Sequence, residues 1–338
     1  MTPLRRPEAM LVMDARSHSQ LFDAPTLHRW RSAASVGVPE WTSELGSPAA
    51  RARLAEVEVL VTSWGAPTLT EELLDAAPRL CAVLHAAGSV RPLVTPEVWR
   101  RGLRVTTAAE ANAQPVAEFA LAAVLWAGKR VPLMGQLARA HREDWGYRRR
   151  HGDLSNHRRT VGVLGFSRVG RRLTSLLRPF DVDVLVADPL ADPAHVRAAG
   201  AQLLDLEDVL PRCDVLSLHA PALPSTHHVL DARRLALLPD GATVVNTARG
   251  ALVDTPALEA ECVSGRLSAV LDVTDPEPLP SGSPLYDLPN VLLTPHVAGA
   301  LDSEVLRLSA AALDELDRYR AGLPALHPVD ERQMAWVA

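Results

Sequence analysis

Short runs of apolar and β-branched residues recur along the chain, and they limit the possible folds more than any other feature of the sequence. They lack the apolar–polar alternation of a half-exposed sheet, so they are typical of strands covered on both faces, as in parallel sheets. Longer segments with helical spacing, such as residues 168–177, lie between them. The repeated strand–helix pattern predicts an α/β protein with two doubly wound sheets. The runs occupy residues 10–14, 57–63, 80–86 and 103–107, then 160–165, 182–188, 213–218, 242–247, 267–273 and 291–295.

Two further helical segments predict the domain organisation. A chain of 338 residues fits two domains of ordinary size. Residues 111–131 are rich in helix-forming residues and predict a long helix that links the domains. The amphipathic residues 302–322 predict a helix that returns to the first domain. We therefore expect a first domain made of residues 1–110 and 300–338, with residues 111–299 inserted as the second.

The composition argues against several classes of partner. The net charge is -5, so the arginine run at 148–150 predicts a solvated surface and no nucleic-acid partner. No apolar run approaches the length of a membrane span, and the N-terminus lacks the apolar segment of a signal peptide. The widely spaced Cys81, Cys213 and Cys262 form no C-x-x-C pair, which predicts reduced thiols in a cytoplasmic protein. We expect Cys81 and Cys213 in the core, and no metal site.

The stretch VGVLGFSRVG, residues 161–170, predicts a dinucleotide-binding loop with a serine in place of the middle glycine of G-x-G-x-x-G. Gly165 is placed to make the tight turn, and Gly170 to let the helix pack closely on the strand. Ser167 is tolerable if its φ stays negative, and its hydroxyl would then donate to a phosphate oxygen. Arg168 and Val169 would complete the loop at the start of the helix.

Asp188 ends the next predicted strand, eighteen residues after Gly170. A carboxylate at this point accepts hydrogen bonds from the adenosine ribose of a dinucleotide. No arginine follows directly in Asp188-Pro189-Leu190, so a 2′-phosphate would be repelled and NAD is favoured over NADP. The alternative is a plain structural turn between a strand and a helix, without a cofactor.

Polar motifs follow three later strands of the second domain: VVNTARGALVD at 244–254, LDVTDPEPL at 271–279 and LLTPHVAGA at 292–300. Ligands of doubly wound sheets bind at the carboxyl ends of the strands, so we expect Arg249, Glu277 and His296 to converge on one cleft. Alone, a Pro-His pair or an Asp-Pro-Glu-Pro turn would be read as structural. The ordered set favours a catalytic site.

The motifs TARG, LDVTDPEP and TPHVAG, in this order after the glycine loop, resemble the D-isomer-specific 2-hydroxyacid dehydrogenase family. The resemblance covers roughly residues 50–325 and includes AAGSVR at 86–91 and PVAE at 115–118. It implies a Rossmann NAD-binding domain inserted in a flavodoxin-like substrate domain. It also implies NAD-dependent interconversion of a 2-oxo acid and a D-2-hydroxy acid.

The resemblance assigns a role to each member of the cleft, and the chemistry supports each role. Reduction of a 2-oxo acid needs a hydride on carbon and a proton on oxygen. His296 suits the general acid, because imidazole titrates near neutral pH. Glu277 would stabilise the protonated ring and fix its orientation, and Arg249 would hold the substrate carboxylate.

The resemblance also implies cofactor and substrate contacts outside the catalytic set. The backbone amides of Ala87, Gly88 and Ser89 would form an anion nest for the substrate carboxylate. Trp64 would wall the pocket or lie in the domain core, and His85 would be structural or support the nest. His227 and His228 would be solvated in a loop, and Thr274-Asp275 stands where many relatives carry an aromatic residue and an acid. The cofactor contacts expected beyond the glycine loop are His219, Thr226, Thr247, Ala248 and, near the nicotinamide amide, Asp272.

The sequence leaves alternatives open for the substrate, the function and the oligomeric state. Formate dehydrogenases of the superfamily pair the histidine with a glutamine, so Glu277 argues against that reaction. Glyoxylate, hydroxypyruvate and larger 2-oxo acids all remain candidate substrates, and the chain is expected to lack the C-terminal regulatory domain of some phosphoglycerate dehydrogenases. An NADH-binding sensor, like the corepressors of the family, is the alternative function. Relatives usually form homodimers through the cofactor domain, and helix 115–127 would either pack across the two-fold axis or be buried within one chain.

Overall fold

The computed structural model describes residues 5–332 and 334, and the chain divides into two compact units. Unit 1 contains residues 1–112 and 300–338, and unit 2 contains residues 113–299. The long helix α6 (Ala109–Gly128) begins in unit 1 and continues into unit 2.

Unit 1 is built on a six-stranded sheet in the order β13-β5-β4-β3-β1-β2. Its strands are parallel except β13, which pairs antiparallel with β5 at one edge. The parallel part has the 2-1-3-4-5 order of flavodoxin-like folds. The strands are β1 (Glu8–Val12), β2 (Ser35–Thr42), β3 (Val59–Thr62), β4 (Ala82–His85), β5 (Arg104–Thr107) and β13 (Pro328–Val329).

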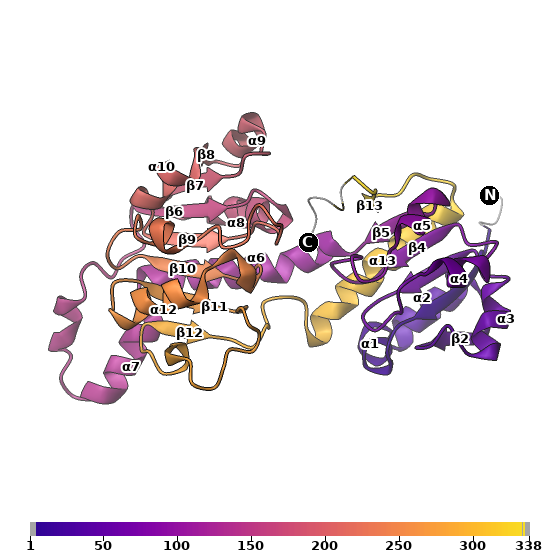
Figure 1. Ribbon diagram of the computed structural model, residues 1–338, viewed down its shortest axis with the longest axis horizontal. Coiled ribbons are helices and arrows are strands. Elements are labelled where there is room, and N and C mark those ends of the chain that lie inside the picture. Colours follow the sequence, from indigo (N-terminus) through magenta and orange to yellow (C-terminus); the bar gives the residue numbers. More distant parts are fainter. Residues whose placement is uncertain (1–4, 333, 335–338) are drawn as a thin grey trace. The chain divides into compact units, whose positions relative to one another are not determined.

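Helices cover both faces of this sheet, because successive strand residues point to opposite sides. One face, with Leu11, Val61 and Leu84, packs on α1, α2 and α13, and the other packs on α3, α4 and α5 (Figure 1). The helices are α1 (Ala15–Leu21), α2 (Ala24–Ala33), α3 (Pro48–Leu54), α4 (Glu71–Asp75), α5 (Pro96–Arg100) and α13 (Leu306–Arg320), the last preceded by the 3₁₀ turn η5 (Asp302–Val305).

Unit 2 contains a seven-stranded, fully parallel sheet in the order β12-β11-β10-β9-β6-β7-β8. Numbered from its own first strand, this is the 3-2-1-4-5-6 order of dinucleotide-binding folds with one added strand. The order reverses between β6 and β9, and ligands of such sheets bind outside this point. The strands are β6 (Arg159–Leu164), β7 (Val182–Ala187), β8 (Gln202–Leu203), β9 (Val215–Leu218), β10 (Thr243–Asn246), β11 (Ser268–Leu271) and β12 (Val291–Leu293).

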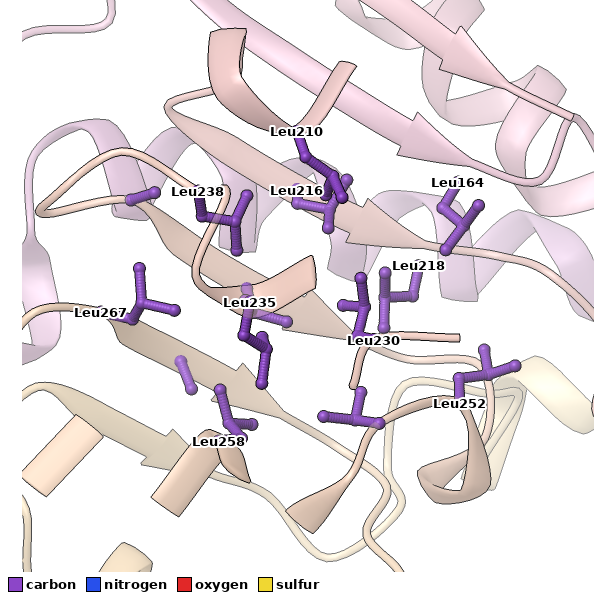
Figure 2. Packing of buried hydrophobic residues seen from close by; sticks show 14 of the residues in the cluster. Leu164, Leu210, Leu216, Leu218, Leu230, Leu235, Leu238, Leu252, Leu258 and Leu267 are labelled. Atoms are coloured by element: carbon purple, nitrogen blue, oxygen red, sulfur yellow. The ribbon is translucent and has the colours of Figure 1, made fainter. Parts of the chain in front are cut away.

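Both faces of the second sheet are also buried. Leu173 and Leu177 of α8 pack with Ala120 and Val124 of α6 on one face. A leucine-rich cluster fills the other face, where Leu216 and Leu218 of β9 lie near leucines from α11 and α12 (Figure 2). The helices are α7 (Val131–His141), α8 (Arg168–Leu177), α9 (Pro193–Ala198), α10 (Leu206–Val209), α11 (Ala232–Leu235) and α12 (Thr255–Val263), and the 3₁₀ turns are η1 (Gly146–Arg150), η2 (Leu210–Arg212), η3 (Gly250–Leu252) and η4 (Pro284–Tyr286).

The predicted fold class, two doubly wound sheets with the second inserted in the first, is confirmed. Two details differ from the expectations. The sequence runs omitted β2, β8 and β13. Cys81, expected in the core, is exposed and lies just before the first residue of β4. Cys213 is buried as expected. Within the residues that the structure describes, no helix is both long and apolar enough to cross a lipid bilayer.

The linking helix α6 packs largely within unit 2. Its Ala120, Ala123, Val124 and Ala127 belong to the core cluster on the α8 side of the sheet. Helix α7, by contrast, has no buried residue. One face of the 115–127 segment is therefore buried within the chain, while Trp126 on the same helix is 48% exposed, so packing across a two-fold axis stays a prediction.

Candidate functional site

The glycine loop joins β6 to α8 at the point where the strand order reverses. Gly165 has a φ of +95°, and a Cβ there would lie 2.6 Å from the backbone nitrogen of Ala220, so only glycine fits. A Cβ on Gly170 would overlap the carbonyl oxygen of Gly165. The first and third glycines therefore have the roles expected of them in a tight turn and in close helix packing.

Ser167, the residue that departs from the glycine pattern, is the N-cap of α8. Its φ is -69°, so it meets the requirement that φ stay negative if a residue with a side chain is to replace the glycine. Its Oγ accepts a hydrogen bond from the Gly170 amide at 3.4 Å, which leaves the hydroxyl proton available to a ligand. Because serine is among the preferred N-cap residues, it replaces the glycine without loss of the helix start.

Asp188 follows β7 and is tied to the glycine loop. Its Oδ2 accepts a hydrogen bond from the Phe166 amide at 2.7 Å, and its Oδ1 accepts one from the Leu190 amide at 2.8 Å. These bonds fix the orientation of the carboxylate, and each oxygen keeps a further lone pair for a ribose hydroxyl.

Two buried polar groups at the ends of the neighbouring strands β9 and β10 have no protein partner. The Nδ1 of His219 and the Oγ1 of Thr247 are buried and make no hydrogen bond among the described residues. Burial lowers the pKa of His219 to about 3, so the ring is neutral, and its Nε2 lies 2.8 Å from the Ser217 hydroxyl. An unsatisfied buried group costs about 1–3 kcal/mol. Both residues were predicted cofactor contacts, and together with the glycine loop they fit a nicotinamide dinucleotide.

Thr226, another predicted cofactor contact, is engaged within its own loop. Its hydroxyl donates to the carbonyl of Pro221 at 2.6 Å and accepts from the amide of Leu223 at 2.8 Å. It therefore shapes the loop after β9, and a direct bond to the cofactor stays a prediction.

Arg249 lies in a turn after β10, and the side chain of Asn246 stabilises this turn with two hydrogen bonds. The buried Asn246 side chain donates to the Arg249 carbonyl at 2.9 Å and accepts from the Ala248 amide at 3.0 Å. Desolvation lowers the pKa of the Arg249 guanidinium, and the negative charge of Glu277 opposes that shift. The charge of Glu277 therefore acts on Arg249, and the convergence of Arg249, Glu277 and His296 on one cleft stays a prediction.

Glu277 and His296 form a direct pair. The Nδ1 of His296 lies 2.6 Å from Oε1 of Glu277, and both side chains are about half exposed. His296 has a φ of +56°, an uncommon conformation for a residue with a side chain. Such strained residues persist only where the surrounding structure holds them.

Asp272 supplies much of this restraint. Its carboxylate is buried and accepts hydrogen bonds from the Thr294 hydroxyl at 2.7 Å and from the amides of Val297 and Ala298 at 2.7 and 2.8 Å. Its carbonyl accepts from the His296 amide at 3.0 Å. Asp272 was predicted as a cofactor contact, and its bonds in the structure go to the segment that carries His296.

The predicted substrate contacts Ala87, Gly88 and Ser89 follow β4 in unit 1. His85 precedes them and is buried, with its Nδ1 2.9 Å from the Thr62 hydroxyl. Burial lowers the pKa of His85 to about 4, against the opposing effect of a hydrogen bond with the Ser89 backbone. His85 therefore joins β3 to the nest segment.

Trp64, the other substrate contact expected in unit 1, is 42% exposed, so the core alternative is wrong. That it and the nest segment contribute to one site with Arg249, Glu277 and His296 stays a prediction.

Sequence reasoning missed three residues that build the site. Asn246 and Thr294 hold the loops described above, and both could have been found as polar residues at the ends of buried strands. Gly250 is the third: a Cβ there would overlap the backbone of Thr274. The glycine of TARG thus allows the Arg249 turn to pack against the loop that carries Glu277.

Comparison with known proteins agrees with this geometry. Residues 121–298 match the family model described as D-isomer specific 2-hydroxyacid dehydrogenase, NAD binding domain. The D-3-phosphoglycerate dehydrogenase of Mycobacterium tuberculosis is 34% identical over 250 residues, which is 74% of this chain and 46% of the relative. This chain thus spans about half the length of that relative.

Two further matches cover a larger share of the similar protein. Formate dehydrogenase 2, mitochondrial, of Oryza sativa is 32% identical over 274 residues, or 80% of this chain and 72% of the relative. The crystal structure of a phosphoglycerate oxidoreductase from Rhizobium etli superposes with a TM-score of 0.83 at 25% identity, and the match covers 97% of this chain and 100% of that one.

Proposed function

Since this chain belongs to the D-isomer specific 2-hydroxyacid dehydrogenase family, we propose that it interconverts a 2-oxo acid and a D-2-hydroxy acid with NAD as the cofactor. The observation that carries the proposal is the 2.6 Å contact between His296 and Glu277, the latter in a loop that packs on the Arg249 turn at Gly250. This set provides a proton donor, a group that stabilises it when charged, and a cation for the substrate carboxylate.

His296 is the general acid and base of the proposed reaction. Its Nδ1 is bonded to Glu277, which leaves Nε2 to give a proton to the carbonyl oxygen during reduction and to take it back during oxidation. Glu277 stabilises the imidazolium and holds the ring plane. NAD, when bound, supplies or accepts the hydride.

Arg249 orients the substrate. Its planar guanidinium would bind the carboxylate of the acid and polarise the adjacent carbonyl group. The amides of Ala87, Gly88 and Ser89 would add a second contact to that carboxylate. Trp64 would form a wall of the pocket.

The cofactor would be held by the loop residues Gly165, Ser167 and Gly170 and by the carboxylate of Asp188. Ser167 would donate its free hydroxyl proton to a phosphate oxygen at the start of α8. Asp188 would accept from the ribose hydroxyls and so select NAD over NADP. The buried polar atoms of His219 and Thr247 would form hydrogen bonds with the cofactor.

The substrate is proposed to be a small 2-oxo acid such as glyoxylate or hydroxypyruvate, and not formate. Oxidation of formate to carbon dioxide releases a hydride but no hydroxyl proton, so it has no need of a proton-transferring pair. The carboxylate of Glu277 beside His296 is suited to a reaction that does transfer one.

A homodimer through unit 2 is proposed from the exposed apolar surface of α7 and the end of α6. Val131 is 38% exposed and Trp126 is 48% exposed. Large apolar side chains left exposed in this way are candidates for a contact between subunits. Light scattering of the purified protein would measure the oligomeric state, and a monomer would contradict the dimer.

The test of the reaction is the rate of NADH oxidation by the purified protein with a panel of 2-oxo acids, with NADPH in parallel. We expect turnover with NADH and one or more acids. His296→Ala should abolish turnover while NADH binding, measured by fluorescence, is retained. His157→Ala, a change at an exposed histidine paired with Asp181, is the matched control and should leave the rate unchanged. Tight NADH binding without turnover on any acid would instead favour the sensor alternative.

A further inference from the structure

His227 and His228 lie in the loop after β9, and Asp275 lies in the loop after β11. Their potential ligand atoms, the imidazole nitrogens and a carboxylate oxygen, all lie within 4.8 Å of one another. In the part of the chain that the structure describes, this is the one group of three or more histidine, cysteine or acidic residues arranged in this way. None of the three has a role in the proposed reaction.

The backbones that carry these side chains rest on the same 3₁₀ turn, η3. The His228 amide donates to the carbonyl of Ala251 at 2.8 Å. Asp275 packs against Gly250, where a Cβ would lie 2.5 Å from the Asp275 nitrogen. The Asp275 carbonyl also accepts from the Thr255 hydroxyl at 2.7 Å. Because adjacent residues of one turn support both loops, the backbones that carry the three side chains are held close together before any ligand binds.

The two imidazole rings are stacked, with centroids 3.9 Å apart and an angle of 23° between their planes. His228 has a φ of +48°, a left-handed conformation that is rare for a residue with a side chain. The surrounding structure must therefore hold the His228 backbone in this conformation beside the ring of His227.

The donor set determines the class of ion. Imidazole nitrogen suits zinc, copper, nickel and iron, and a carboxylate completes a set of three ligands that leaves a coordination position for water. A hard cation such as Mg²⁺ or Ca²⁺ prefers oxygen ligands. Two nitrogens and one oxygen therefore favour a divalent transition metal.

We propose that His227, His228 and Asp275 bind one divalent transition-metal ion, with Zn²⁺ as its representative. The ion would join the loop after β9 to the loop that carries Glu277, two residues beyond Asp275. Because the site requires the folded arrangement of both loops, the ion would stabilise the folded state.

The experiment uses the whole chain without an affinity tag, stripped of metal by a chelator. Zn²⁺ binding is measured by titration calorimetry, and Co²⁺ serves as a spectroscopic probe of the ligands. The test variants are Asp275→Asn, which keeps the shape of the side chain, and His228→Asn, because asparagine tolerates a positive φ. His157→Asn is the matched control, since His157 is exposed in the same unit and lies 3.0 Å from a single carboxylate, Asp181. Circular dichroism establishes that each variant is folded.

We expect one Zn²⁺ per chain in the unchanged protein and in His157→Asn, together with a rise in Tm on saturation. Asp275→Asn and His228→Asn should each weaken the affinity by about tenfold or more. The proposal is wrong if no saturable binding occurs, or if a folded Asp275→Asn variant binds as tightly as the unchanged protein. A thiolate-to-cobalt absorption band would also overturn it, because the exposed Cys81 would then be the ligand.

Discussion

Two buried histidines should make the fold sensitive to acid, one in each unit. Burial lowers the pKa of His85 in unit 1 to about 4 and that of His219 in unit 2 to about 3. In the unfolded chain both rings titrate near pH 6.5. Below pH 6.5 the unfolded state therefore binds more protons than the folded state, so stability rises with pH in that range. The stabilisation is complete above pH 6.5 and decreases as the pH falls towards 4 for His85 and 3 for His219.

The magnitude follows from these pKa values. At pH 5 an unfolded histidine is almost fully protonated, while either folded ring is still neutral. The linkage relation then gives a loss of about 2 kcal/mol for each histidine between pH 8 and pH 5. A domain has a total stability of only about 5–15 kcal/mol, so each loss is measurable.

The perturbation is to replace each ring separately by a side chain that does not titrate, with His85→Gln and His219→Gln. Each protein is equilibrated in urea at pH 8 and at pH 5. It is then labelled briefly with deuterium at one fixed pH, and mass spectrometry of peptides reports the unfolding of each unit separately. Carboxylates contribute to acid sensitivity in all the proteins, so the informative quantity is the difference between the unchanged chain and the variant.

We expect His85→Gln to reduce the pH dependence of unit 1 by about 2 kcal/mol and to leave that of unit 2 unchanged. His219→Gln should show the reverse. The absolute stability lost through the missing hydrogen bonds does not affect this comparison. If both variants keep the acid sensitivity of the unchanged chain, the two rings are not held neutral by burial and the reasoning fails.

Three further predictions concern the loops of the proposed site. Gly165→Ala should weaken NADH binding by about tenfold or more, because overpacking against the Ala220 backbone costs about 1–3 kcal/mol. Gly265→Ala is the control, at a φ of +77° with open space around it, and should leave the Kd from fluorescence titration unchanged. Equal effects of the two changes would refute the steric clash at Gly165. Ser167→Ala should lower the free energy of unfolding by about 1 kcal/mol through loss of the N-cap, and Ser167→Gly by only a few tenths, as measured by urea denaturation; the same loss in both would contradict the capping role. Asp272→Asn should reduce kcat by about tenfold or more, because an amide cannot accept all three hydrogen bonds of the carboxylate. Asp287→Asn, a change at an exposed aspartate, is the control. An unchanged kcat in Asp272→Asn would contradict the prediction.

Elements with strong local signals could be predicted from the sequence. Helix α8 has the bounds expected from its apolar spacing, because its N-cap and its periodicity are both local. Strand β2 was missed because Gly37 and Pro39 interrupt it, and proline is typical of edge strands. It pairs with β1 in two segments separated by an irregular register, which no local pattern encodes.

The members of the candidate site could be named from the sequence, while the hydrogen bonds that connect them could not. His296, Glu277 and Arg249 could be identified because motif order and strand ends place them at one edge of the sheet. The bonds of Asp272 to the 294–298 segment depend on the backbone path of two loops and on the positive φ of His296. The proximity of His228 and Asp275, 47 residues apart in the chain, depends on the same tertiary detail.

The loop after β11 is the element on which the geometry of the proposed catalytic set depends. Its start, Asp272, fixes the segment that carries His296, and its later part bonds that ring through Glu277. Its middle, Thr274-Asp275, packs directly on Gly250, so it also determines how close the Arg249 turn can approach. A side chain larger than hydrogen at position 250 would meet the backbone of Thr274 and Asp275, so the Arg249 turn or the loop that carries Glu277 would have to shift. The positions of the proposed proton donor and of the proposed carboxylate clamp are therefore linked through the backbone of this loop, and the glycine of TARG is the residue that permits the close packing.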